Sequence, residues 1–184
     1  MSIIRNGIQN KSIFGPDSMA AIFCVAFLSL KLLFLTFPSG VDSTVVAFKS
    51  LEELTKESVM IVKGTVTDIL TEWNSEHTLI ISFVTIRIEK RYKGKIDITA
   101  DTIVVRQIGG ELEGYFTEVV GAPKFTVGEE VVLFLEPAEN NFYHVFGMFQ
   151  GKYRLEKGIG KNMDNQRSLP FEELDLKIKK FIGQ

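Results

Sequence analysis

The sequence predicts a mainly β domain, a small closed or partly closed barrel of five short strands. Three observations support this fold class. Apolar and polar residues alternate with a period of two in several segments between residues 58 and 156, as in half-buried strands. Glycines interrupt these segments and would bend them. No strand–helix–strand rhythm is present, which disfavours a doubly wound α/β fold.

A short helix is expected over residues 48–57, before the barrel begins. Phe48, Leu51 and Leu54 recur at helical spacing, and Ser50 with Glu53 has the spacing of a capping box. These features predict a short helix with Ser50 as a cap.

The barrel strands are predicted from alternation and from the breakers between them. In the first strand Val62, Gly64 and Val66 would face inward, and the glycine indicates a bend or a close backbone approach. Residues 71–77 are interpreted as a turn. The predicted strands cover residues 59–70, 78–92, 102–107, 129–136 and 142–149. The fifth is open to continuation through residues 151–156, with breaks at Gly147 and Gly151.

The chain ends in a predicted amphipathic helix that begins after Ser168. Ser168 would cap it, and Pro170 is tolerated in its first turn. The polar face carries both signs of charge, which favours docking on the barrel over binding to a membrane. The apolar stripe consists of Phe171, Leu174, Ile178 and Phe181.

A double glycine, Gly109-Gly110, follows the third strand and raises the question of a phosphate-binding loop. Such a loop needs a helix amino terminus after it, and the segment that follows has no helical stripe and three glutamates. We therefore interpret the pair as a turn out of the strand, with the chain extended again from Pro123. The residues predicted to have structural roles are Gly64, Gly94, Gly109, Gly110, Pro123 and Gly128.

Composition narrows the possible functions. The chain of 184 residues has a net charge of −2, which disfavours binding to nucleic acid. Cys24 is the only cysteine, so no internal disulfide and no cysteine metal site is expected, and the two histidines lack metal-ligand spacing. No nucleophile–base motif or paired acids stand out. We predict a protein that is not an enzyme and that has no metal and no cofactor.

Residues 20–37 form an apolar run with a single lysine, Lys31, and end at a Pro-Ser-Gly breaker. This pattern predicts either a cleaved signal peptide, which we favour, or a membrane anchor. In both cases the folded domain would lie outside the cytoplasmic membrane, secreted, periplasmic or anchored. The expected organisation is an N-terminal extension over residues 1–43, a barrel domain over 44–160, and a linker with the C-terminal helix over 161–184.

Several segments together resemble a family of uncharacterised exported bacterial and archaeal domains. The resemblance covers Leu51–Glu156 and rests on VMIVKGTVTDI, FVTIRIEKRYKG, TIVVRQIGG, FTVGEEVVLFL and FYHVFGMFQGKYRLE. It implies an OB-type barrel. More distantly, the first two segments are similar to the netrin-like module, which includes the tissue inhibitors of metalloproteinases. Those inhibitors use an amino-terminal cysteine, and this chain has none outside the apolar run.

The predicted function is a non-catalytic extracytoplasmic module that binds a protein partner through the loop over residues 107–123 and the rim of the fifth strand. An oligosaccharide or single-stranded nucleic acid on the barrel face is one alternative. Modulation of a secreted protease is another, implied by the resemblance alone. A structural alternative is that Tyr115 and Phe116 plug one end of the barrel. The candidate binding residues are Gln107, Glu111, Tyr115, Phe116, Tyr143 and His144.

Overall fold

The computed structural model describes residues 47–94, 101–162 and 167–183, and these belong to one compact unit. The predicted signal or anchor segment over residues 20–37 lies outside the described residues. Within the described ranges, no helix is both long enough and apolar enough to cross a membrane.

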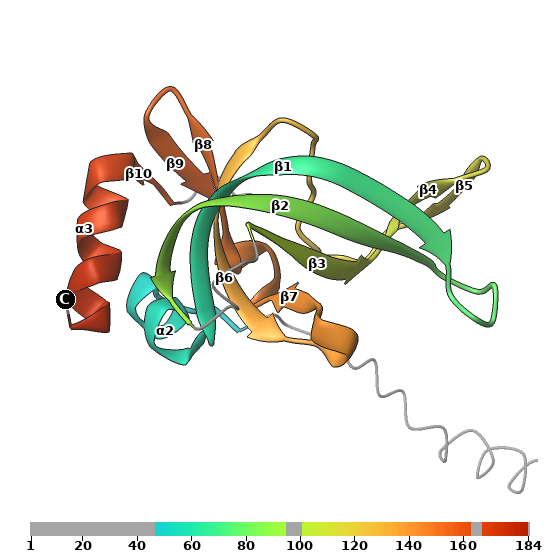
Figure 1. The fold of residues 1–184 in the computed structure, drawn as a ribbon, viewed down its shortest axis with the longest axis horizontal. Coiled ribbons are helices and arrows are strands. Elements are labelled where there is room, and N and C mark those ends of the chain that lie inside the picture. Colours follow the sequence, from blue (N-terminus) through green and yellow to red (C-terminus); the bar gives the residue numbers. More distant parts are fainter. Residues whose placement is uncertain (1–46, 95–100, 163–166, 184) are drawn as a thin grey trace, which may run out of the picture. The chain divides into compact units, whose positions relative to one another are not determined.

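Five strands close into an OB-like barrel, which confirms the predicted fold class (Figure 1). They pair in the order β1-β2-β3-β7-β6, and β6 pairs with β1 to complete the circle. Every pairing is antiparallel except β3 with β7, which is parallel and has one register pair, Val105 with Tyr143. The strands are β1 (Met60–Trp73), β2 (Ile80–Lys93), β3 (Thr102–Ile108), β6 (Glu130–Pro137) and β7 (Tyr143–Val145).

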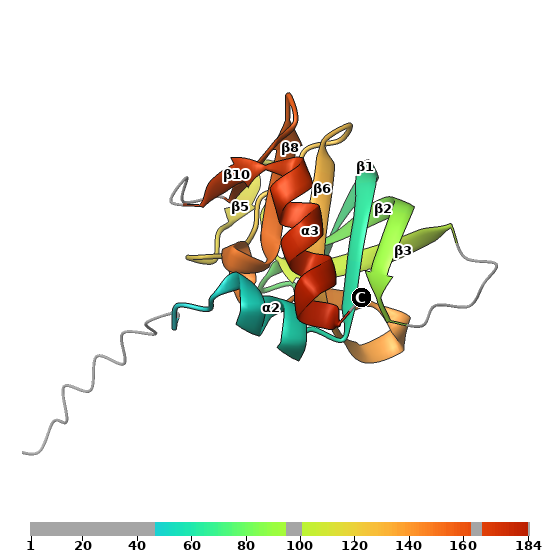
Figure 2. The same cartoon turned by 90° about the vertical axis from the view of Figure 1, so that its left-hand side faces the viewer.

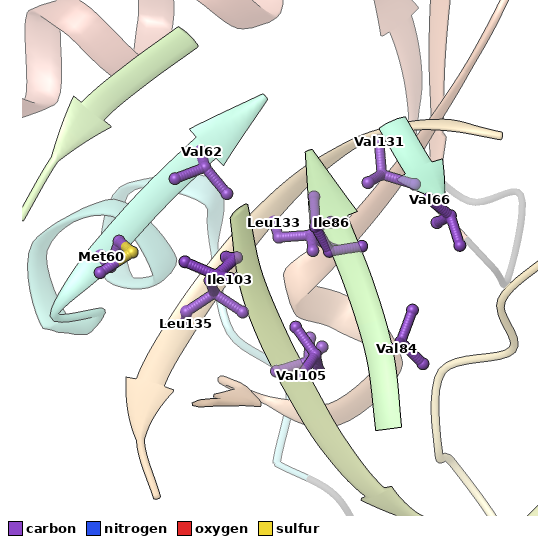
Figure 3. Close-up of a cluster of buried hydrophobic side chains, with 11 residues drawn as sticks. Met60, Val62, Val66, Val84, Ile86, Ile103, Val105, Val131, Leu133 and Leu135 are labelled. Carbon is purple, nitrogen blue, oxygen red and sulfur yellow. The ribbon is translucent and has the colours of Figure 1, made fainter. Parts of the chain in front are cut away.

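Aliphatic side chains from all five strands fill the barrel interior (Figure 3). Val62 and Val66 face inward, as their alternation predicts, and both are fully buried. Five consecutive residues of β6, from Val131 to Leu135, are also fully buried. A strand that is buried on both faces loses the polar alternation, and this explains the continuous apolar run in its sequence.

Gly64 lies at a close approach between β1 and β2. A Cβ atom at this position would be 2.3 Å from the carbonyl oxygen of Arg87, which only glycine avoids. The pairing of β1 with β2 also shifts register on either side of this region, between Lys63 and Gly64 and between Val66 and Asp68. The predicted close backbone approach is therefore confirmed, and the register shifts let two long strands curve around the barrel.

The chain after β7 is interrupted where the predicted breaks at Gly147 and Gly151 lie. A 3₁₀ turn, η2 (Met148–Gly151), follows Gly147, and the next strand, like β7, pairs antiparallel with β6. This next strand starts a small outer sheet. Residue 160, the expected end of the barrel domain, lies inside one strand of that sheet. The outer strands are β8 (Lys152–Glu156), β9 (Ile159–Asn162) and β10 (Ser168–Pro170), and a further 3₁₀ turn is η1 (Glu139–Asn141).

Two helices cover the outer faces of β1 and β6 (Figure 2). Helix α2 (Leu51–Glu57) begins after its N-cap Ser50, and the predicted capping box with Glu53 is present. Phe48, expected in the helix, lies before it and is 70% exposed. Helix α3 (Phe171–Ile182) buries Leu174 and Ile178 completely, so the predicted docking on the barrel is confirmed. The predicted cap was wrong, because Ser168 lies in β10 and Pro170 occupies the N-cap position without a side-chain hydrogen bond.

Candidate binding site at the mouth of the barrel

An open pocket of about 300 Å³ lies at the mouth of the barrel, beyond the last apolar layer of its core. The strands continue past that layer, and their inward positions become polar at Thr71, Ser82 and Gln107. Residues 108–111, 116–119 and 122–125 form most of the remaining wall. Barrel mouths are a common place for ligand sites, because side chains converge there without filling the space.

A small hairpin forms one wall of the pocket, where the sequence predicted an irregular loop. It consists of β4 (Gly110–Leu112) and β5 (Tyr115–Thr117). Four hydrogen bonds hold it on the barrel strands, and the hairpin is therefore fixed relative to the pocket. These run from Thr71 Oγ1 to the Glu111 carbonyl (3.2 Å), from Ser82 Oγ to the Gly109 carbonyl (2.5 Å), from the Gly109 amide to the Ile80 carbonyl (2.9 Å) and from the Ile80 amide to Thr117 Oγ1 (3.3 Å).

The double glycine makes this attachment possible. Gly109 and Gly110 have φ values of 126° and 141°, which other residues rarely adopt. A Cβ atom on Gly110 would lie 2.7 Å from Ser82 Oγ. A strand follows the pair rather than a helix, so the amides do not form a helix amino terminus for phosphate. The predicted structural role of the pair as a turn fits this geometry.

Aromatic side chains border the mouth, and we call Trp73, His77, Tyr115 and Phe116 the aromatic rim. Trp73 is half-buried, and the other three are exposed. The Trp73 ring stacks on His77 at 6.1 Å and meets Tyr115 edge-on at 5.4 Å. Tyr115 and Phe116 are 63% and 66% exposed, which contradicts the alternative that they plug the barrel. Figure 1 shows β4 and β5 beside the end of β1 where Trp73 lies, and α3 is at the opposite end.

The surroundings of the mouth are strongly acidic. The two segments that border it, residues 68–79 and 107–124, contain six acidic residues and one basic residue, a net charge of −5. The single base, Lys124, is already paired with Glu118 at 2.8 Å. The chain as a whole carries only −2, so negative charge is concentrated at this end of the molecule.

The six candidate residues from the sequence divide into two groups. Gln107, Glu111 and Phe116 line the pocket, and Tyr115 stands next to them on the aromatic rim. Tyr143 and His144 do not line the pocket. Tyr143 packs against the barrel core, and His144 Nδ1 lies 2.6 Å from the carbonyl oxygen of Arg106 across the β3–β7 pairing.

Sequence reasoning missed Thr71, Trp73 and Ser82. The first two were assigned to a turn, although the inward period of the strand continues through Ile69, Thr71 and Trp73. Ser82 was hidden in an apolar strand, where a small polar residue at an inward position was the available signal. Continuing the period of the second strand back from Val84 would have found Ser82, but the register shift between Val66 and Asp68 hid Thr71 and Trp73 from the period of the first.

A second pocket of about 300 Å³ lies beside β8 and contains a buried ion pair. Lys152 donates to Glu129 at 2.5 Å and to the Lys124 carbonyl, and its ammonium lies 4.3 Å from the Phe125 ring centroid. Burial lowers the pKa of Lys152, and the bond to Glu129 opposes this change. Because its partners come from the chain itself, this lysine ties residues 124–129 to β8.

Comparisons with protein-family models and with curated protein sequences find no match for this chain. Over the described ranges, no three His, Cys, Asp or Glu side chains are grouped in a way that could hold a metal ion. The geometry of the mouth is therefore the basis on which a function can be argued.

Proposed function

We propose that the chain is a non-catalytic binding module that holds a protein partner at the mouth of its barrel. The observation that carries this proposal is the aromatic rim over an open pocket. Tyr115 and Phe116 expose most of their surface to solvent on a hairpin that hydrogen bonds fix in place. Exposed, ordered aromatic side chains are typical anchors of protein interfaces.

The negative charge at the mouth also favours some classes of partner over others. Six acidic residues around it would repel phosphates, which argues against nucleic acid and anionic lipid surfaces. A polypeptide with basic residues has the complementary charge. We also propose that the domain acts outside the cytoplasmic membrane, and the apolar run over residues 20–37 supports this location.

An oligosaccharide is the second candidate ligand, favoured by one specific observation. The pocket combines an exposed phenyl ring, Phe116, with the polar side chains of Gln107 and Glu111. Aromatic rings can cover the apolar face of a sugar while such acceptors bind its hydroxyl groups. OB barrels bind both oligosaccharides and oligonucleotides, so the fold is compatible with this ligand.

Site-specific photocrosslinking in intact cells tests the proposal. A photoreactive amino acid would replace Phe116 in one full-length variant and Leu176 in another, because both side chains are 66% exposed and they lie on opposite ends of the domain. We expect a discrete protein adduct from position 116 and none from position 176. Identical adducts from both positions, or none from position 116, would contradict the proposal.

Replacing the two rim aromatics provides a matched loss-of-function test. Tyr115→Ala with Phe116→Ala should abolish capture of the partner by a tagged chain. Because both side chains are exposed, the fold should lose only about 0.5 kcal/mol of stability per residue. Circular dichroism checks folding, and a double variant that is folded yet still captures the partner would count against the rim.

A further inference from the structure

The pocket wall combines a carboxylate and a phenyl ring in a fixed pair. Glu111 on β4 and Phe116 on β5 are directly opposite each other in the hairpin register, and both line the pocket. Directly paired residues have their side chains on the same face of a hairpin. The Glu111 carboxylate forms no hydrogen bond or ion pair with any described residue, so its charge is available to a ligand.

The other polar groups of the pocket are mostly acceptors or are already used. The hydroxyl groups of Thr71 and Ser82 donate to backbone carbonyls of the chain. Gln107 Oε1 is buried and has no hydrogen-bond partner among the described residues. The only basic group, Lys124, is paired with Glu118. A ligand that completes this pocket must therefore bring hydrogen-bond donors and positive charge.

We propose that the pocket receives an arginine side chain of the partner, with its guanidinium against the Phe116 ring and paired to the Glu111 carboxylate. This inference rests on the proposed function and names the group that the partner supplies. A planar guanidinium stacks on an aromatic ring and also presents a fork of donors to a carboxylate. Its apolar stem fits a pocket whose other walls include Ile69, Val84 and Val119.

Charge around the mouth supports this assignment at longer range. The net charge of −5 on the bordering segments attracts a basic partner and speeds its association. The same field disfavours acidic peptides, so the mouth would select by repulsion as well as by attraction.

The test compares three capped hexapeptides that alternate leucine with arginine, lysine or citrulline. Citrulline has the shape of arginine without its charge. Binding to the isotopically labelled full-length chain, kept soluble in mild detergent, would be followed by amide NMR shifts. We expect saturable shifts over residues 107–117, with the arginine peptide about tenfold or more tighter than the citrulline peptide. Equal affinities for these two peptides would overturn the inference.

Three variants on the same hairpin make the test specific. Glu111→Gln should weaken the arginine peptide about tenfold and remove its advantage over citrulline. Glu113→Gln is the matched control, because Glu113 is an exposed residue of the hairpin turn and does not line the pocket. Phe116→Leu keeps an apolar side chain but should reduce the preference for arginine over lysine. If the two glutamine variants weaken binding equally, the arginine peptide is held only by general charge attraction, and the inference is overturned.

The failure of this inference can be separated from failure of the proposed function. If Glu111→Gln leaves the adduct from position 116 unchanged, the interface stands and the arginine assignment falls. If position 116 yields no protein adduct, the proposed function itself falls. An oligosaccharide that shifts the same amides while the arginine peptide does not would overturn the arginine assignment and favour the second candidate ligand.

Discussion

Asp175 on α3 accepts hydrogen bonds from three side chains at the junction of the helix with β2. The donors are Lys90, Tyr92 at 2.7 Å and Lys179 at 2.6 Å. Burial opposes ionisation of the carboxyl group, but these hydrogen bonds outweigh it and hold the pKa of Asp175 well below its usual value. The same contacts, with burial as the main cause, raise the pKa of the Tyr92 hydroxyl.

We expect Asp175→Asn to destabilise the fold by about 2 kcal/mol at neutral pH, because the charge-assisted hydrogen bonds are lost. A carboxyl group with a lowered pKa stabilises the native state fully above about pH 4 and progressively less below it. The variant should therefore lose less stability on acidification than the parent chain. Urea unfolding at pH 7 and pH 3 measures both effects.

Asp68→Asn provides the control for this prediction. Asp68 is exposed on β1 and makes no ion pair with a described residue, so its replacement should change stability by no more than about 0.5 kcal/mol. If the two variants have the same dependence on pH, the Asp175 cluster does not stabilise the fold in the way described.

At the scale of elements, two fully buried side chains of α3 make its main apolar contacts with the barrel. Leu174 and Ile178 are fully buried in the outer cluster, while Leu176 on the opposite face is 66% exposed. Leu174→Ala should reduce the free energy of unfolding by about 2–5 kcal/mol, because it removes buried contacts and leaves a cavity. Leu176→Ala should change it by about 0.5 kcal/mol or less. Equal losses in urea titrations would contradict this assignment of faces.

The elements also differ in how far the sequence could predict them. Long strands with alternating residues, such as β1 and β2, and the capped helix α2 follow from local pattern, and their positions were predicted well. The outer strands β9 and β10 are only four and three residues long, which is too short for a periodic signal. They form because β9 pairs with the edge of β8 and β10 pairs with β9, which is a tertiary effect.

The residues of the candidate site also differ in how far the sequence could predict them. Gln107, Glu111 and Phe116 were proposed from a loop that was polar and aromatic, and all three line the pocket. His144 was predicted to supply a polar group on the rim of the fifth strand, but its ring instead bonds to the Arg106 carbonyl. This contact could not be predicted from the sequence, because the two residues are 38 positions apart and meet only when the barrel closes.

For the whole molecule, the pairing of β3 with β7 is the weakest part of the barrel wall. It has one register pair, whereas β1 and β2 share 12. The His144 hydrogen bond to Arg106 and the contact of Phe83 with Phe142, 5.1 Å between ring centroids, reinforce this seam. We infer that thermal opening of the barrel starts here, because few interactions must break.

Hydrogen exchange tests this inference. His144→Ala should increase exchange at the amides of β7 about tenfold, the effect of losing roughly 1.4 kcal/mol, and leave β1 and β2 nearly unchanged. His77→Ala is the control, because the exposed His77 lies on the rim and away from the seam. A uniform change over all strands would instead indicate that the barrel opens only by global unfolding.

Trp73 is the only tryptophan in the chain, and it belongs to the aromatic rim. The indole emission of the entire protein therefore originates within contact distance of Tyr115 and His77, at the mouth of the barrel. A ligand that orders or desolvates this rim would change the emission, while events at α3 would leave it almost unaffected. The fluorescence of Trp73 can therefore report the binding of a ligand at the mouth of the barrel without an added label.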